Sequence, residues 1–143
     1  MGFKAIDLTP IAVYGPTAVT PYGKDLLVKA FLVSRTDTTA TIKAVLPGDS
    51  TIIDIRMVGI ASNAVTTATV NVGSTVAAIE YVNAQDVKTA GGMIRPTTAY
   101  STNLPNLENT PITTDLPIYA KYAETGGAST LGGPYTVFVQ YVR

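Results

Sequence analysis

Short segments in which apolar and polar residues alternate, separated by turn-forming residues, constrain the fold of this chain more than any other feature. In one of them Ile53, Ile55 and Met57 alternate with Asp54 and Arg56. Alternation with period two places successive side chains on opposite faces of a β-strand, so Ile53, Ile55 and Met57 are predicted to share one face. Repeated at intervals of about 8–12 residues, such segments are typical of a β-sandwich or β-barrel. The sequence therefore predicts an all-β domain.

The predicted strands cover most of the chain after its first two dozen residues. In chain order we expect them at 26–34, 39–46, 51–60, 67–72, 76–82, 118–123 and 135–142. Proline, glycine and aspartate at 47–49 form a turn between two of these strands, because proline presets φ and glycine accepts positive φ. The last two strands are expected to form a hairpin across the glycine-rich segment 126–133. The final strand carries β-branched and aromatic residues on both faces, which predicts a central or covered position.

Two segments depart from the strand pattern. Residues 83–92 predict one short crossover helix, since Asn83 can cap it and Gly91 and Gly92 can end it. Residues 93–116 are polar and rich in proline, which predicts a long loop holding at most a short strand near Ile94. A loop of this length in a compact domain is usually functional or held by a partner.

Prolines punctuate the first 23 residues at Pro10, Pro16 and Pro21. Proline is excluded from helix interiors and central strands, so we expect residues 1–23 to form an extended N-terminal arm. Residues 24–143 then form a single antiparallel β-sandwich domain. The arm is too short to have a core of its own, and its apolar residues must be buried either on this domain or on a neighbouring subunit.

The charge content limits the choice of partners. Charged residues make up 14% of the chain, against an average near 25%. Ten basic and ten acidic residues cancel, so no long-range field attracts the chain to nucleic acid or to an anionic membrane. We expect neither as a partner, and we expect the chain to be made in the cytoplasm without a targeting segment. A weakly charged, threonine-rich surface favours a protein held in an assembly, although a neutral soluble domain remains the alternative.

The chain has few of the groups that catalysis and metal binding use. Histidine and cysteine are absent, which removes the commonest general base, the commonest metal ligands and a thiol nucleophile. The ten acidic residues are scattered singly along the sequence. We therefore expect no enzyme activity, no catalytic or metal residues, no cofactor and no small-molecule substrate. A small enzyme, a bound calcium ion or a glycan site would need residues brought together by the fold.

Four segments, in order, resemble small virion proteins of tailed bacteriophages. They are LPGDSTIIDIR at 46–56, TATVNVG at 67–73, YVNAQDVKTAGG at 81–92 and YTVFVQY at 135–141. The resemblance covers about two-thirds of the chain, and the order of the segments is more specific than any one of them. Residues 96–117 depart from it. It implies a jelly-roll-like β-sandwich of the head decoration (cement) or head-fibre type, located on the capsid surface of the virion.

The resemblance implies a function for the arm and the long loop. We expect a decoration or cement protein that stabilises the head shell by binding the major capsid protein, and that forms a homo-oligomer in which a trimer is favoured. A fibre or spike module that binds a host receptor or glycan is the alternative. The expected partner contacts are apolar and aromatic residues of the arm and the loop: Phe3, Ile6, Leu8, Ile11, Tyr14, Tyr100, Leu104 and Leu107.

Overall fold

The computed structural model describes residues 25–96 and 114–143, and within them every regular element is a β-strand. The eight strands are β1 (Leu26–Val33), β2 (Thr41–Leu46), β3 (Thr51–Gly59), β4 (Thr67–Gly73), β5 (Val82–Asp86), β6 (Gly92–Ile94), β7 (Leu116–Thr125) and β8 (Tyr135–Val142). The eight site residues predicted from the sequence and the whole of the arm over 1–23 lie outside the described residues.

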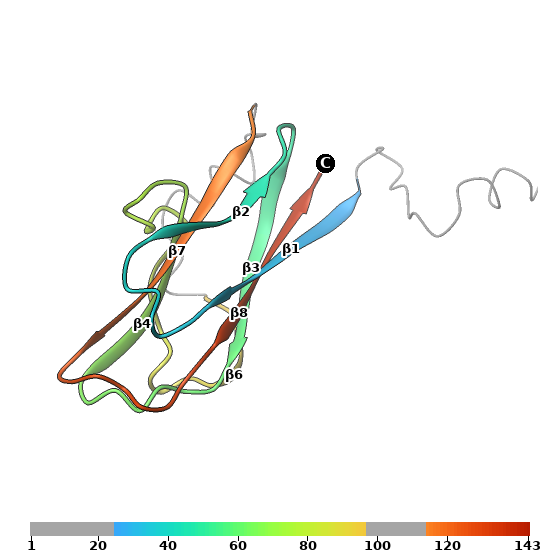
Figure 1. Cartoon of the computed structure of the whole chain (residues 1–143). Coiled ribbons are helices and arrows are strands. Elements are labelled where there is room, and N and C mark those ends of the chain that lie inside the picture. Colours follow the sequence, from blue (N-terminus) through green and yellow to red (C-terminus); the bar gives the residue numbers. More distant parts are fainter. Residues whose placement is uncertain (1–24, 97–113) are drawn as a thin grey trace, which may run out of the picture.

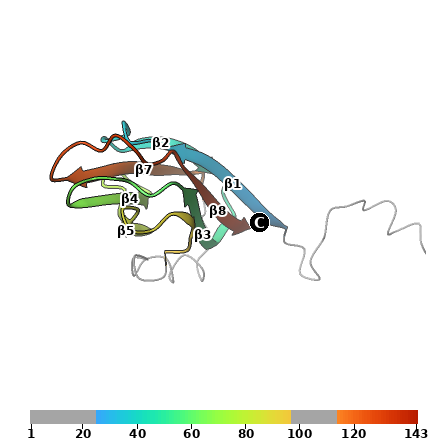
Figure 2. The same ribbon diagram turned by 90° about the horizontal axis from the view of Figure 1, so that it is seen from below.

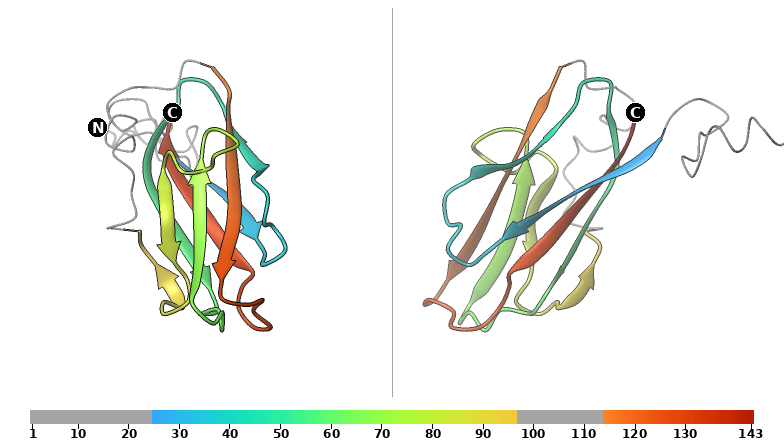
Figure 3. Two further views of the ribbon diagram at one scale, coloured as in Figure 1. Left: turned by 90° about the vertical axis from the view of Figure 1, so that its left-hand side faces the viewer. Right: turned by 45° about the vertical axis from the view of Figure 1, so that its right-hand side comes forward.

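The strands form two four-stranded antiparallel sheets that pack face to face (Figures 1 and 3). One sheet has the order β1-β8-β3-β6, and the other has the order β2-β7-β4-β5. The apolar side chains between the sheets form one cluster, which includes Leu46, Ile55, Val70, Ile118 and Val139, each fully buried. The predicted antiparallel β-sandwich is confirmed.

Consecutive strands lie in opposite sheets, with the exception of β4 and β5. The predicted hairpin of the last two long strands is therefore wrong: β7 pairs with β2 and β4, whereas β8 pairs with β1 and β3. Figure 2 shows β7 and β8 in different layers of the sandwich. Across the core the rings of Tyr122 and Tyr135 stack with centroids 6.2 Å apart. Alternation in two strands indicates that each has one buried face, which is equally true of partners in a hairpin and of strands that face each other across a core.

The predicted central position of the last strand is confirmed. β8 lies between β1 and β3, and its alternate residues Tyr135, Val137, Val139 and Tyr141 are buried in the core. Its other residues are half-buried on the outer face of the sheet. A strand with two neighbours and a buried face suits the β-branched and aromatic residues of this segment.

A β-bulge in β3 changes one predicted face. The pairing of β3 with β8 shifts between Ile52 and Asp54, so Ile53 is the extra residue of the bulge and is 37% exposed. Ile52 takes the core position instead and is fully buried. The prediction placed Ile53 with Ile55 and Met57 because it assumed unbroken alternation. A bulge shifts the phase of alternation, and the residue pattern alone does not show it.

The predicted helix over 83–92 is wrong. Residues 82–86 form β5, which pairs with β4, and the backbone N–H of Ala84 donates to Oδ1 of Asn71 at 2.8 Å. Asp86 then ends the strand in a turn, because its Oδ1 accepts from the backbone N–H groups of Lys88 and Thr89. A two-turn helix has little stability of its own, and pairing with β4 buries Val82 completely.

The strand predicted over 76–82 is also wrong before Val82. Residues 74–81 turn around the carboxylate of Glu80, which accepts a hydrogen bond from the backbone N–H of Ser74 at 3.0 Å, while Val76 is 73% exposed. The short strand expected near Ile94 is confirmed as β6. The turn at 47–49 is confirmed, although the positive φ falls on Asp49 and not on the glycine.

Two methionines on paired strands provide a matched test of the sandwich. Met57 of β3 is fully buried in the core, whereas Met93 of β6 is 65% exposed on the outer face. Met57→Ala is expected to lower the free energy of unfolding by about 2–5 kcal/mol, because it leaves a cavity. Met93→Ala is expected to change it by less than about 0.5 kcal/mol. Denaturant unfolding measures both, and equal effects would contradict the assigned faces.

Candidate interaction surface

The outer face of the β2-β7-β4-β5 sheet is largely polar over its two central strands. There Thr67 and Thr69 of β4 lie beside Thr125 and Ala123 of β7, and the hydroxyls of Thr67 and Thr125 are 2.6 Å apart. Lys121 lies on the same face, opposite Asn71. Threonine and lysine on a strand face are what a sheet presents to water.

The outer face of the β1-β8-β3-β6 sheet is different, because apolar side chains continue across its four strands. The strand register places eight of them together, which we call the apolar sheet face: Leu26, Val28, Ala30, Leu32, Val58, Met93, Phe138 and Val142. Leu26, Val28, Leu32 and Met93 each expose half or more of their surface. Thr136, Gln140 and Arg56 lie among them on the same face. Exposed apolar side chains gathered on one face usually mark a contact with another protein surface.

The edge strand β1 extends this surface beyond the sandwich. Leu26, Leu27 and Val28 are all exposed, although their side chains alternate between the two faces of the sheet. Figure 1 shows the Leu26 end of β1, in blue, beside the C-terminus at the margin of the sandwich. β1 pairs with β8 on one side only. A long apolar edge strand also offers its backbone N–H and C=O groups to an added strand.

A buried charge lies beside the apolar sheet face. Asp54 is opposite Gln140 on the outer face, yet its side chain is only 7% exposed. Its Oδ2 accepts from Nε of Arg56 at 2.7 Å, and its Oδ1 is 3.5 Å from Nε of Arg95. The side chains of Arg56 and Arg95 are 42% and 60% exposed. They cover the carboxylate and leave positive charge at the surface next to apolar residues.

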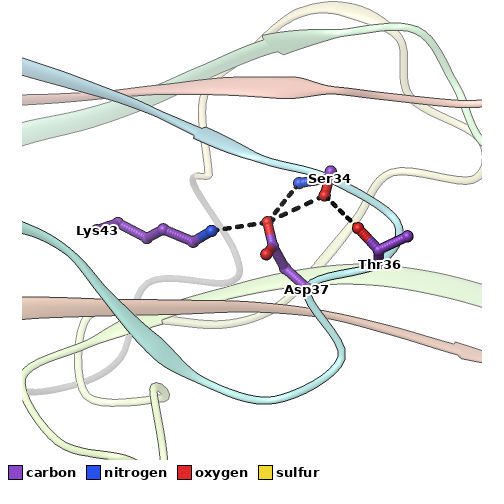
Figure 4. A network of polar contacts seen from close by, with 4 residues as sticks. All are labelled: Ser34, Thr36, Asp37 and Lys43. Carbon is purple, nitrogen blue, oxygen red and sulfur yellow. Dashed lines mark hydrogen bonds and ion pairs between the residues drawn. The ribbon is translucent and has the colours of Figure 1, made fainter.

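A polar network holds the corner where the chain passes from β1 to β2 (Figure 4). Oδ2 of Asp37 accepts from the backbone N–H of Ser34 and from Nζ of Lys43, both at 2.8 Å. Burial would raise the pKa of Asp37, but the hydrogen bonds from Lys43 and Ser34 and the charge of Lys43 outweigh it and lower the pKa. The backbone carbonyl of Asp37 accepts a hydrogen bond from the N–H of Tyr122 in β7. The network therefore fixes the end of β1 against the opposite sheet.

A second polar cluster joins two loops at the same end of β7, on the side chains of Tyr122 and Glu124. The hydroxyl of Tyr122 lies 2.9 Å from that of Ser62 and donates to Glu124 at 2.7 Å. Glu124 also accepts from the hydroxyl and the backbone N–H of Ser129, whose carbonyl accepts from Arg35. The hydrogen bonds from Ser129 and Tyr122 lower the pKa of Glu124. An ionised carboxylate that accepts several hydrogen bonds is a weak base. The cluster therefore holds the two loops together and is poorly suited to accept a proton.

Tyr135 lies beneath this cluster. Burial raises the pKa of its hydroxyl to about 12, and the nearby Tyr122 adds to the effect. Its phenol therefore stays neutral at physiological pH. In the part of the chain that the structure describes, no three acidic residues gather as a metal site would require. That part also contains no helix long and apolar enough to cross a membrane.

The apolar sheet face was not among the residues predicted to contact a partner, which all belong to the arm and the long loop. The signal for it was present in the sequence. The segments that form β1 and β8 are apolar on both faces, and only one face of each can point into the core. The choice of face required the register, which the three-dimensional structure supplies.

Comparison with known proteins shows the fold. No family model and no curated protein matches the chain. Among solved structures, the chain is similar to one in the capsid asymmetric unit of cyanophage Pam1, with a TM-score of 0.62 and 21% identity over 86% of this chain and 88% of that one. A chain of the acid-stable capsid of Helicobacter pylori bacteriophage KHP30 matches with a TM-score of 0.49 and 12% identity, over 84% and 93% of the two chains.

The lowered pKa of Glu124 predicts a pH effect of known sign. In the unfolded chain the group titrates near its ordinary value of 4.5, and in the folded chain it titrates lower. Its contribution to stability is therefore complete above pH 4.5 and is lost as the pH falls through the folded pKa. Glu124→Gln is expected to lower stability at pH 7 and to reduce the difference in stability between pH 7 and pH 3.

The measurement is denaturant unfolding at both pH values. Ser129→Ala removes one donor to the carboxylate and is expected to act in the same direction with a smaller effect. Asp37, Glu80 and Asp86 also have lowered pKa values and remain in both variants. Acid destabilisation should therefore be reduced but not abolished. The same pH dependence in wild type and both variants would contradict the role of this cluster.

Proposed function

We propose that this chain is a structural protein of a bacteriophage virion. The observation that carries the proposal is the fold that it shares, over most of both chains, with a chain of the Pam1 capsid asymmetric unit. Fold similarity alone does not define a function. The proposal is supported independently by the apolar sheet face, because a protein of a shell works through contacts with neighbouring subunits.

The sandwich is further proposed to be a jelly roll. The orders β1-β8-β3-β6 and β2-β7-β4-β5, with almost every connection passing between the sheets, are those expected from two Greek keys wound together. Jelly rolls are frequent in viral capsids. The resemblance of four sequence segments to small virion proteins agrees with this assignment.

Within the virion we propose a decoration or cement role on the outer surface of the head shell, after synthesis in the host cytoplasm. The partners are the major capsid protein and other copies of this chain, with a trimer favoured because it suits the local three-fold positions of an icosahedral shell. Weak contacts are sufficient there, since they are repeated over the lattice. The low charge content leaves few ionic groups to desolvate at such contacts.

A non-enzymatic role remains part of this proposal. The polar clusters of the described residues serve loops and corners, and the carboxylates of Asp37 and Glu124 are held ionised by hydrogen bonds. A fibre or spike that binds glycans would present exposed aromatic rings. Tyr81, Tyr122, Tyr135 and Tyr141 are instead buried, and Tyr119 is half-buried. The described residues thus favour the cement role over the adhesive one.

Binding to phage heads tests the proposal. Purified protein added to heads that lack it is expected to bind and to raise the temperature at which they release DNA. Electron microscopy should locate it on the outer surface of the shell. A chain lacking residues 1–20 is expected to bind more weakly, because the arm carries five of the predicted contacts. Density on the tail, or no binding by the full chain, would contradict the cement role.

The two sheet faces allow a matched test of the interaction surface. Leu32→Glu places a charge on the apolar sheet face, and Thr69→Glu places the same charge on the polar face of the opposite sheet. Leu32→Glu is expected to reduce binding to heads at least tenfold, which corresponds to about 1.4 kcal/mol. Thr69→Glu is expected to leave binding within a factor of two or so of wild type. Equal losses would assign the contact elsewhere.

A further inference from the structure

The apolar sheet face needs a cover, and the sequence of this chain contains a suitable one. Residues 1–24 precede β1 and carry closely spaced apolar residues, among them Phe3, Ile6, Leu8 and Ile11. We infer that the apolar sheet face of each copy is covered by residues 1–24 of a neighbouring copy. The inference rests on the homo-oligomer that the proposed function includes, but it does not require binding to a shell. If it holds, Leu32→Glu and the loss of residues 1–20 weaken binding to heads by weakening the contact between copies.

The direction of the chain at β1 favours a neighbouring copy over the same copy. The ladder between β1 and β8 continues past Leu26, because the backbone N–H of Asp25 donates to the carbonyl of Arg143 at 2.8 Å, and the N–H of Arg143 donates back at 3.2 Å. Asp25 is therefore still in line with the strand. Residues 1–24 therefore join the domain at the end of the edge strand β1, at the margin of the sheet and not over its face.

The length of residues 1–24 is sufficient for this contact. A fully extended chain spans about 3.3 Å per residue, so the segment reaches about 80 Å. Four strands about 4.8 Å apart present a face about 15 Å wide from the first strand to the last. The segment can therefore leave its own domain and still cross the whole face of another.

The chemistry of the two surfaces is complementary. Ile6 and Leu8 flank Asp7, which is the one acidic residue of the segment; its two basic residues are Lys4 and Lys24. The apolar sheet face also combines apolar residues with charge, because the side chains of Arg56 and Arg95 are partly exposed where they pair with Asp54. An acidic residue between two apolar ones fits a surface that is apolar and locally positive.

The absence of cysteine from the sequence allows a direct test by disulfide formation. One chain carries Thr136→Cys. Thr136 lies in the central strand β8, between Leu32 of β1 and Val58 of β3 in the same chain. A second chain, longer by a tag, carries one cysteine in place of Lys4, Thr9 or Thr17, so that several registers of the segment are sampled. Thr69→Cys on the polar face of the opposite sheet is the matched control for Thr136→Cys. Both replace a half-buried threonine on the outer side of a central strand.

The two chains are mixed, concentrated and oxidised, and the yield of mixed disulfide dimer is measured. For at least one cysteine position in residues 1–24, the yield with Thr136→Cys is expected to be several-fold higher than the yield with Thr69→Cys. Mixed dimers no more abundant than the control at all three positions would overturn the inference and leave the face to another occupant such as the capsid protein. A single chain carrying both cysteines that forms only an intrachain disulfide, with no mixed dimer, would also overturn it. Binding to heads is measured separately, so this result and the proposed function can fail independently.

Discussion

The pairing of β8 with two neighbours at once is the interaction on which the rest of the structure depends. β1 and β3 are both distant from β8 in the sequence and do not pair with each other. Only β8, which lies between them, joins them into one sheet. Its buried residues also face the opposite sheet, where Tyr135 stacks on Tyr122. Backbone hydrogen bonding within the sheet and packing between the sheets therefore meet in one eight-residue strand. The corner network of Asp37 and the loop cluster of Glu124 act around this centre by fixing how the chain passes between the sheets.

A β-sandwich has two outer faces, and in this protein they are unequal. The polar face of β4 and β7 is suited to water, whereas the apolar sheet face spreads from β1 to β6. Burying apolar area is the main favourable term in both folding and association. The apolar residues of the outer face can therefore stabilise contact with another protein surface by the same effect that the inner face uses to stabilise the domain. The few charges near it, Asp54 with Arg56 and Arg95, are paired with each other.

Much of the fold could be predicted from alternation, since six of the seven predicted strands and the strand near Ile94 are present close to their expected ranges. The failures share a physical cause. The β7–β8 hairpin, the helix over 83–92 and the face of Ile53 all depended on which segment pairs with which, and that is decided by contacts distant in sequence. Val82 and Ala84 lie in a strand because β4 is beside them and pairs with their segment. The candidate surface was missed for the same reason: apolar residues in β1 and β8 were evident, but not which of them point outward.

The sequence by itself determined the class of the domain, the absence of histidine and cysteine chemistry, and the excess of apolar residues in the first and last strands. These properties follow from composition and from the period of two along each strand, which are local. Only the tertiary structure decided that β7 and β8 lie in opposite sheets, that a bulge turns Ile53 outward, and that the surplus apolar residues gather on one face. Register and sheet membership depend on pairing free energies between distant segments, and a single strand does not carry that information.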